Sequence, residues 1–159
     1  MSTGLIISEI HDNERLKKVI IDWSKPRSLD KNWYDEILSG RGLYYLSRKF
    51  GKKDTLLYIG QTFDCFYNRF VAHDWYWLNK YRGEKRFRLG SITYPTGKTD
   101  VEMNQLIKDV ESVLIYTMKP KENIMGIYSY TPKHLYVVSN TEYLGELPKT
   151  ISMRDHIPL

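Results

Sequence analysis

The sequence is short of several features that would each have suggested a particular class of protein. Its 159 residues include one cysteine, Cys65, so no disulfide can form within the chain and a four-cysteine zinc site is excluded. No apolar run approaches the roughly 18 residues that a membrane-spanning helix needs. No basic stretch followed by a long apolar one marks a secretion signal. We therefore expect a cytoplasmic (intracellular) protein with no membrane partner.

Aromatic residues and positive charge are, by contrast, plentiful. The chain is 42% hydrophobic and 14% aromatic, with 13 tyrosines and 4 tryptophans, which suits one domain with a real core. Its net charge is +5 and its pI is near 9.1, which favours a polyanionic partner. Aromatic rings pack cores, but they also stack on bases. Nucleic acid is therefore one partner that the composition allows.

The first forty residues are predicted to be helical. Apolar residues recur close to helical spacing over residues 5–23. Lys25-Pro26 would end that helix, because proline cannot continue one. A second, short helix is predicted to begin at Ser28 or Asp30, either of which can cap it, and to reach residue 38.

The periodicity then changes to that of β-strands. Residues 42–47 and 55–61 are short, apolar and aromatic, and they flank a Gly-Lys-Lys-Asp turn, so they predict a hairpin. A helix is predicted over residues 64–79 and a third strand over residues 87–94. Residues 82–88 are predicted as a basic loop before this strand.

The clearest helix in the sequence begins after Thr99. Thr99 and Glu102 fit a capping box, in which each side chain satisfies a free backbone N–H of the other residue. Apolar residues at helical spacing over residues 103–114 give this helix an inner face, and Lys119-Pro120 would stop it. The last forty residues predict one strand, over residues 135–139, and otherwise turns.

Glu111 borders the apolar stripe of this helix, so its carboxylate does not face freely into water. A carboxylate in such a position needs a partner. One interpretation is a salt bridge to a nearby lysine or arginine. The other is a ligand for a hard divalent cation, because one carboxylate with several waters commonly holds Mg²⁺ beside a phosphate.

Two further pairs of residues carry chemistry suited to a phosphodiester. Arg69 and His73 are four residues apart and share one face of the predicted helix. Arginine binds phosphate and histidine moves protons near neutral pH, although a solvated helix face would look the same. Tyr44 and Tyr58 lie on the hairpin and either pack as a cross-strand pair or serve as proton acceptors. The second role requires nearby cations to lower a phenol pKa.

Taken together and in this order, these residues resemble the GIY-YIG nuclease family. The resemblance covers residues 42–123 and differs in the first motif by leucine in place of isoleucine, which fills the same volume. The matching positions are Gly42-Leu43-Tyr44, Tyr58-Ile59-Gly60, Arg69 with His73, Glu111, and Pro120 with Asn123.

The resemblance implies a fold and a domain organisation. The fold would be α+β, with a small mixed or antiparallel three-stranded sheet flanked by helices and an N-terminal helical extension. The chain would divide into that helical extension (residues 1–40), a catalytic core (residues 41–125) and a C-terminal extension packed on the core (residues 126–159).

The chemistry implied by the resemblance is metal-dependent hydrolysis of phosphodiester bonds in DNA. Glu111 would hold one Mg²⁺ or Mn²⁺ per active site, and Arg69 would stabilise the charge that builds on the phosphate. Tyr44 or Tyr58 would orient or deprotonate the attacking water, and the sequence does not choose between them. His73 would accept a proton from that tyrosine or act on the water directly.

Supporting contacts are predicted around this site. Asn123 would hydrogen-bond to Tyr44 or to the backbone at a strand end. Basic residues on the hairpin turn and in the predicted loop would neutralise DNA phosphates, although the same charges could serve solubility alone. These residues are Lys52, Lys53, Lys80, Arg82, Lys85, Arg86 and Arg88.

The sequence thus predicts an endonuclease for double-stranded DNA, of the stand-alone type found in restriction systems or phages. One active site cuts one strand, so a double-strand break implies a homodimer or sequential nicking. Two alternatives stay open. One is a module of the same fold that binds nucleic acid without cutting it, and the other is a nuclease directed at RNA, which the 2′-OH would distinguish.

Overall fold

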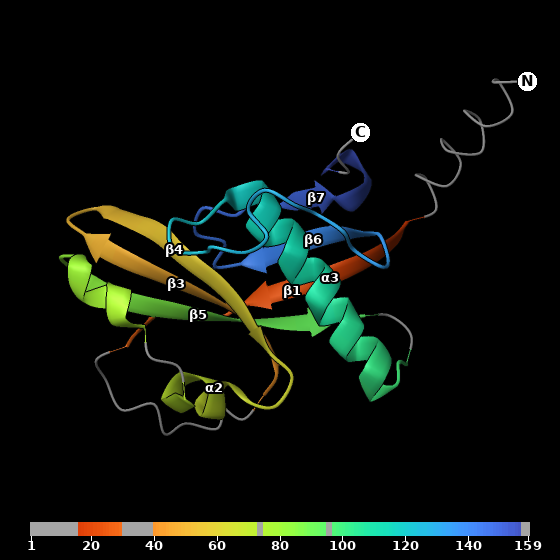
Figure 1. The fold of residues 1–159 in the computed structure, drawn as a ribbon, viewed down its shortest axis with the longest axis horizontal. Coiled ribbons are helices and arrows are strands. Elements are labelled where there is room, and N and C mark those ends of the chain that lie inside the picture. The colour runs from red at the N-terminus through yellow and green to blue at the C-terminus, as the bar shows by residue number, and fades with distance from the viewer. Residues whose placement is uncertain (1–15, 30–39, 73–74, 95–96, 157–159) are drawn as a thin grey trace, which may run out of the picture.

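The computed structural model describes residues 16–29, 40–72, 75–94 and 97–156 (Figure 1). These residues form a curled, mixed sheet of seven strands in the order β4–β3–β5–β1–β6–β7, with β2 also paired to β5. The strands are β1 (Lys17–Trp23), β2 (Arg27–Ser28), β3 (Gly42–Phe50), β4 (Lys53–Thr62), β5 (Glu84–Thr93), β6 (Tyr136–Glu142) and β7 (Thr150–Ser152). The helices are α2 (Phe66–Ala72), α3 (Asp100–Met118) and the 3-10 helices η2 (Tyr76–Lys80) and η3 (Met153–His156).

This architecture corrects the fold class predicted from the sequence. The expected three-stranded sheet flanked by helices is instead a seven-stranded half-barrel, and the parts of the chain that are described contain two α-helices. The order β3–β4–α2–β5–α3 is present, but strands β4, β3 and β5 belong to a larger sheet that β1, β6 and β7 continue. The prediction failed because β1 pairs with β5 and, in parallel, with β6, which lies more than a hundred residues away in the chain.

The predicted N-terminal helix is wrong over residues 17–23, which form β1. Val19, Ile21 and Trp23 are buried while the residues between them are exposed, and this two-residue period is that of a strand. Ile20, which a helical stripe would bury, is 37% exposed. The rest of that predicted helix and most of the second one fall on residues 1–15 and 30–39, outside the described residues.

Two layers of side chains cover the sheet. Helix α3 packs on one face, where its apolar stripe joins Val19, Ile21 and Tyr45 in the larger core (Figure 1). Helices α2 and η2 supply the other face, in an aromatic core that includes Tyr44 and Phe70. No helix in the described ranges is both long enough and apolar enough to cross a membrane.

The elements around the candidate site agree with the sequence to different degrees. The capping box of α3 is confirmed, with Thr99 as N-cap and Glu102 bonded back to it. The helix predicted over residues 64–79 is instead the short α2 followed by η2, with residues 73–74 undescribed. The basic loop predicted over residues 82–88 is wrong from Glu84 onward, where β5 begins.

Strand β4 lies at one end of the sheet order, and the segment after α3 completes its free side. The backbone N–H of Glu122 donates to the Leu57 carbonyl at 2.8 Å. The Asn123 side chain accepts from the N–H of Ile59 and donates to the Ile59 carbonyl, both at 2.9 Å. The Asn123 side chain is 6% exposed. It pairs with the backbone of β4 as a neighbouring strand would, next to Tyr58.

Replacing this amide should loosen the edge of the sheet. We expect Asn123→Ala to reduce the free energy of unfolding by about 1–3 kcal/mol, because two buried backbone groups of Ile59 lose their partners. Amide hydrogen exchange should also accelerate at Ile59 more than in the centre of β3.

The control is Asn68→Ala, since the exposed Asn68 amide bonds to Asp64 on the surface. Unchanged exchange at Ile59 in Asn123→Ala would contradict this account of the β4 edge.

Candidate active site

The two glycines of the sequence motifs have steric reasons to be glycine. Gly60 pairs across the hairpin with Tyr44, and a Cβ at Gly60 would lie 2.3 Å from the Tyr44 hydroxyl and ring. Gly42 has a φ of 147°, and a Cβ there would lie 2.3 Å from the Gly90 carbonyl oxygen. Gly42 therefore allows its backbone to approach that of Gly90, and Gly60 makes room for the ring of Tyr44.

Tyr44 lies at the centre of an aromatic cluster. Its side chain is fully buried, it stacks on Tyr58 at a centroid distance of 6.1 Å, and Phe70 packs edge-on against it at 5.4 Å. Its hydroxyl oxygen accepts a hydrogen bond from Nε of Arg69 at 3.0 Å. Burial raises the pKa of Tyr44 well above its ordinary value, so this phenol stays protonated at neutral pH.

Arg69, in the last turn of α2, connects the two tyrosines. Burial alone would lower the pKa of this guanidinium, but hydrogen bonds and electrostatic interactions with Tyr44 and Tyr58 raise it overall. The side chain is only partly buried. A permanently charged group is thus held in a fixed orientation by two phenols while part of its surface remains accessible.

Glu111 projects from the middle of α3 towards the same charge. Its burial raises the pKa of the carboxyl to about 7, while Arg69 and Lys108 act in the opposite direction. Its Oε2 atom is buried and has no hydrogen-bond partner among the described residues. A carboxylate that is removed from water and left unpaired in this way is one that a cation would stabilise.

A groove of about 390 Å³ lies at the β4 edge, and Glu111 is one of its lining residues. Tyr58, Trp77, Glu111 and Asn123 contribute to its walls. Its rim is apolar and exposed, with fractional exposures of 75% for Tyr76, 84% for Ile124 and 85% for Met125. An acidic group within an open groove that has apolar edges can receive an extended substrate with both charged and planar parts.

The structure brings most of the predicted catalytic residues to one place. Tyr44 and Tyr58 come from the hairpin, Arg69 from α2, Glu111 from α3 and Asn123 from the segment after it. The amide of Asn123 bonds to the strand backbone beside Tyr58, not to Tyr44. His73 lies outside the described residues, so its predicted role as proton acceptor has no structural account.

The predicted DNA-contacting residues separate into two groups. Lys52 and Lys53 at the hairpin turn and Arg82 are exposed, and Lys80 is exposed but forms an ion pair with Glu122 at 2.9 Å. The hairpin turn lies beside the start of β5, so the two basic segments meet at one end of the sheet.

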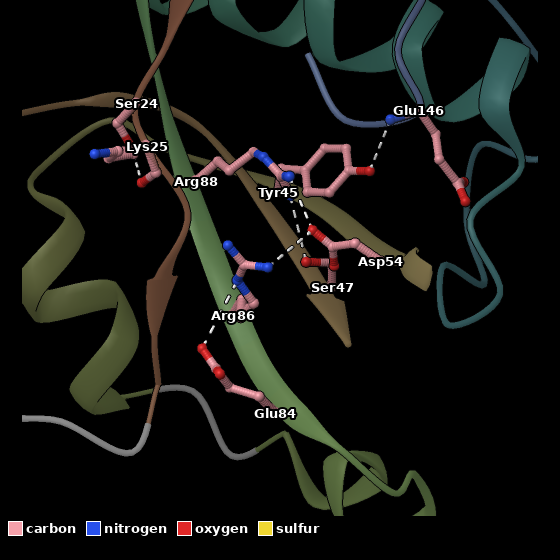
Figure 2. Close-up of polar contacts among 9 residues, drawn as sticks. All are labelled: Ser24, Lys25, Tyr45, Ser47, Asp54, Glu84, Arg86, Arg88 and Glu146. Atoms are coloured by element: carbon pink, nitrogen blue, oxygen red, sulfur yellow. Dashed lines mark hydrogen bonds and ion pairs between the residues drawn. The ribbon is translucent and has the colours of Figure 1, made fainter. Parts of the chain in front are cut away.

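The other group consists of residues of β5, which were predicted to lie in a loop. Lys85 is partly buried. Figure 2 shows Arg86 and Arg88 directed at Asp54, at 3.6 and 2.9 Å. Arg88 is 6% exposed and lies 4.8 Å from the ring centroid of Tyr45. These two arginines therefore neutralise a carboxylate within the protein, and we leave them out of any DNA surface.

The groove suits a hard divalent cation that prefers oxygen ligands better than it suits zinc. In the described ranges, no group of three or more His, Cys, Asp and Glu side chains could hold a metal ion, so a zinc-type protein cage is not available there. Glu111 with its unpartnered oxygen offers one carboxylate, which together with water fits Mg²⁺ or Mn²⁺.

Comparisons with family models, with curated proteins and with solved structures find no match for this chain. The assignment of the groove therefore rests on the chemistry of its residues.

Sequence reasoning missed several residues of the groove. The apolar rim at Ile124 and Met125 had no signal beyond two apolar residues in a turn region. The sequence did not distinguish which rings of the run Trp75-Tyr76-Trp77 pack in the core. The two tryptophans are each 7% exposed, and Tyr76 is the exposed ring.

The raised pKa of Glu111 predicts how stability depends on pH. Between its ordinary value of 4.5 and the folded value of about 7, the folded protein keeps a proton that the unfolded chain has lost. Stability should therefore fall as pH rises across this window, by about 3 kcal/mol at most, and stay at the lower level above it.

Urea unfolding in the presence of EDTA at pH 5 and pH 8 measures this difference. We expect Glu111→Gln to lose less stability between the two pH values than the wild type, and Glu142→Gln, at an exposed position, to behave as the wild type. An identical pH profile in Glu111→Gln would show that this carboxyl is not buried as described.

Proposed function

We propose that this chain is a metal-dependent endonuclease of the GIY-YIG type that hydrolyses phosphodiester bonds in double-stranded DNA. The observation that supports this most is Glu111, which lines the groove with a buried Oε2 atom that has no hydrogen-bond partner in the described residues and which interacts electrostatically with the Arg69 guanidinium that two tyrosines orient. Phosphodiester cleavage needs a cation-binding carboxylate and an arginine close to it; Glu111 lines the groove and Arg69 interacts with it electrostatically.

Each of these residues has a role in the proposed reaction. Water attacks phosphorus, the bond to the 3′ oxygen breaks, and the leaving oxygen takes up a proton. Glu111 would hold Mg²⁺ or Mn²⁺, which supplies a Lewis acid for the scissile phosphate and the leaving oxygen. Arg69 stabilises the negative charge that builds on the non-bridging oxygens.

The two tyrosines have different roles in this proposal. Tyr44 is fully buried, with a raised pKa, and its hydroxyl is occupied by Arg69, so it orients the guanidinium. Tyr58 lines the groove and is therefore the tyrosine that can contact the attacking water. Asn123 fixes the backbone next to Tyr58.

The DNA surface in this proposal combines the groove with one end of the sheet. Lys52, Lys53 and Arg82 are exposed and supply positive charge for backbone phosphates. Lys53 lies five residues along β4 from Tyr58, about 17 Å in an extended strand. The exposed rim of Tyr76, Ile124 and Met125 can contact bases, because rings and aliphatic side chains stack on or insert between them.

The biological setting that we propose is a restriction-type or phage-type enzyme acting in the cytoplasm, with a dimer or sequential nicking for double-strand breaks. A module that binds nucleic acid without cutting it is the main rival. Burying a carboxylate without a partner costs stability, and binding alone gives no reason to retain Glu111 in that state. This favours catalysis.

Cleavage of supercoiled plasmid tests the proposal. With Mg²⁺ we expect the wild type to nick or linearise the plasmid and EDTA to abolish this. Glu111→Gln should lower the rate by at least about 100-fold, and Arg69→Lys, which keeps the charge but loses the paired donors, by about 10–100-fold. Glu142→Gln, purified in parallel, is the matched control for charge.

Equal cleavage by Glu111→Gln would contradict the assignment of the metal ligand. Salt-sensitive DNA binding without cleavage of DNA or RNA would leave the binding module as the better description. Cleavage of RNA alone would identify the RNA-directed alternative.

A further inference from the structure

A second cavity, of about 680 Å³, lies on the opposite flank of α3 from the Glu111 groove. It opens where the start of β1, the end of β5, the first turns of α3, the loop before β6 and η3 meet. Glu102 on its wall and Glu111 are nine residues apart, which is two and a half helical turns and about 14 Å. The remaining half turn directs the two side chains to opposite sides of α3. The two sites share no lining residue.

Positive charge from separate segments converges on this cavity. Lys17, Lys98, Lys133 and Arg154 all line it, and none of them forms an ion pair within the described ranges. Glu102 is the carboxylate in the lining, and its Oε1 is engaged by the N–H and hydroxyl of Thr99 in the capping box. Lys98 also interacts electrostatically with Glu102. The cavity therefore keeps an excess of positive charge that an anion would neutralise.

The walls of the cavity are held by buried contacts. Asp109 is 2% exposed, and its carboxylate accepts from the backbone N–H groups of Lys133 and His134, each at 3.0 Å. Gln105 donates to the same carboxylate at 2.9 Å. The Lys133 backbone is thus fixed against α3, so its charge does not depend on a loose loop for its position.

Aromatic rings and an unsatisfied donor complete the lining. Tyr94 and Tyr136 pack edge to face at 6.0 Å. The ammonium of Lys98 lies 4.3 Å from the Tyr94 ring centroid and that of Lys17 lies 6.0 Å from it. Nε of Arg154 is buried and finds no hydrogen-bond acceptor among the described residues. A buried donor of this kind is open to an acceptor from a ligand.

We propose that this cavity binds a phosphate group of a ligand. A phosphate offers several acceptor oxygens and up to two negative charges, which matches one arginine and three lysines better than a single carboxylate would. The volume exceeds that of phosphate itself, so the ligand is a phosphate ester whose remaining part lies against Tyr94 and Tyr136. Its source is a nucleotide or the backbone of a nucleic acid, and both present the same group.

Calorimetric titration of the full chain tests this proposal. The probes are inorganic phosphate, adenosine 5′-monophosphate and a short DNA duplex, each at matched ionic strength, with chloride as the reference anion. The double variant Lys98→Gln/Lys133→Gln should bind adenosine monophosphate or the duplex at least about tenfold more weakly than the wild type. The control is Lys121→Gln/Lys149→Gln, which removes the same charge at exposed positions outside the cavity.

The three probes distinguish a nucleotide ligand from a nucleic-acid backbone. Binding of phosphate and the monophosphate, weakened only in the cavity variant, supports a nucleotide ligand. Binding of the duplex alone, weakened more in the cavity variant than in the control, supports a nucleic-acid backbone. The titrations do not measure cleavage, so a failure of the nuclease activity leaves this result intact. Absence of binding to every probe, or equal loss in both double variants, would overturn the proposal, and circular dichroism checks that each variant is folded.

Discussion

The candidate site depends on how the free side of strand β4 is completed. A strand at the edge of a sheet exposes unpaired N–H and C=O groups, and proteins commonly cover or pair them. Here the backbone of Glu122 and the side chain of Asn123 pair with β4 on either side of Tyr58. The segment that follows α3 is thereby fixed against the hairpin, and α3 delivers Glu111 beside it.

The polar groups of the candidate site differ in whether they have a hydrogen-bond partner. The aromatic core under β3 and β4 removes water from Tyr44 and Arg69, which then bond to each other. Glu111 shares their electrostatic environment without a hydrogen bond to its Oε2. The Asp54 carboxylate shows a contrast (Figure 2), because its Oδ2 atom forms ion pairs with both Arg86 and Arg88.

Local signals in the sequence predicted local structure. The capping box of α3 and the β3–β4 hairpin were predictable, since both depend on residues close together in the chain. The strand character of β1 was obscured because Ile20 stands beside the alternating Val19 and Ile21, so both periods fit. The pairing of β1 with β6 joins segments more than a hundred residues apart, which no local pattern reports. Arg86 and Arg88 resembled a basic loop because their partner, Asp54, comes from another strand.

The candidate site, like the fold, was predictable only in part. The motifs and their order predicted that Tyr58, Glu111 and Asn123 lie near one another. They did not predict that Tyr44 is buried while Tyr58 lines the groove. The apolar rim and the basic cavity across α3 are each formed by segments far apart in the chain, so no local sequence pattern predicted them.

Mn²⁺ binding is the measurement that shows whether Glu111 holds a divalent cation, as we propose. Electron paramagnetic resonance can count bound Mn²⁺ per chain at pH 8 in the presence of a phosphorothioate DNA duplex that resists cleavage. The account predicts one bound Mn²⁺ per chain in the wild type and its loss in Glu111→Gln. Equal binding by both proteins, or no binding by the wild type, would contradict it.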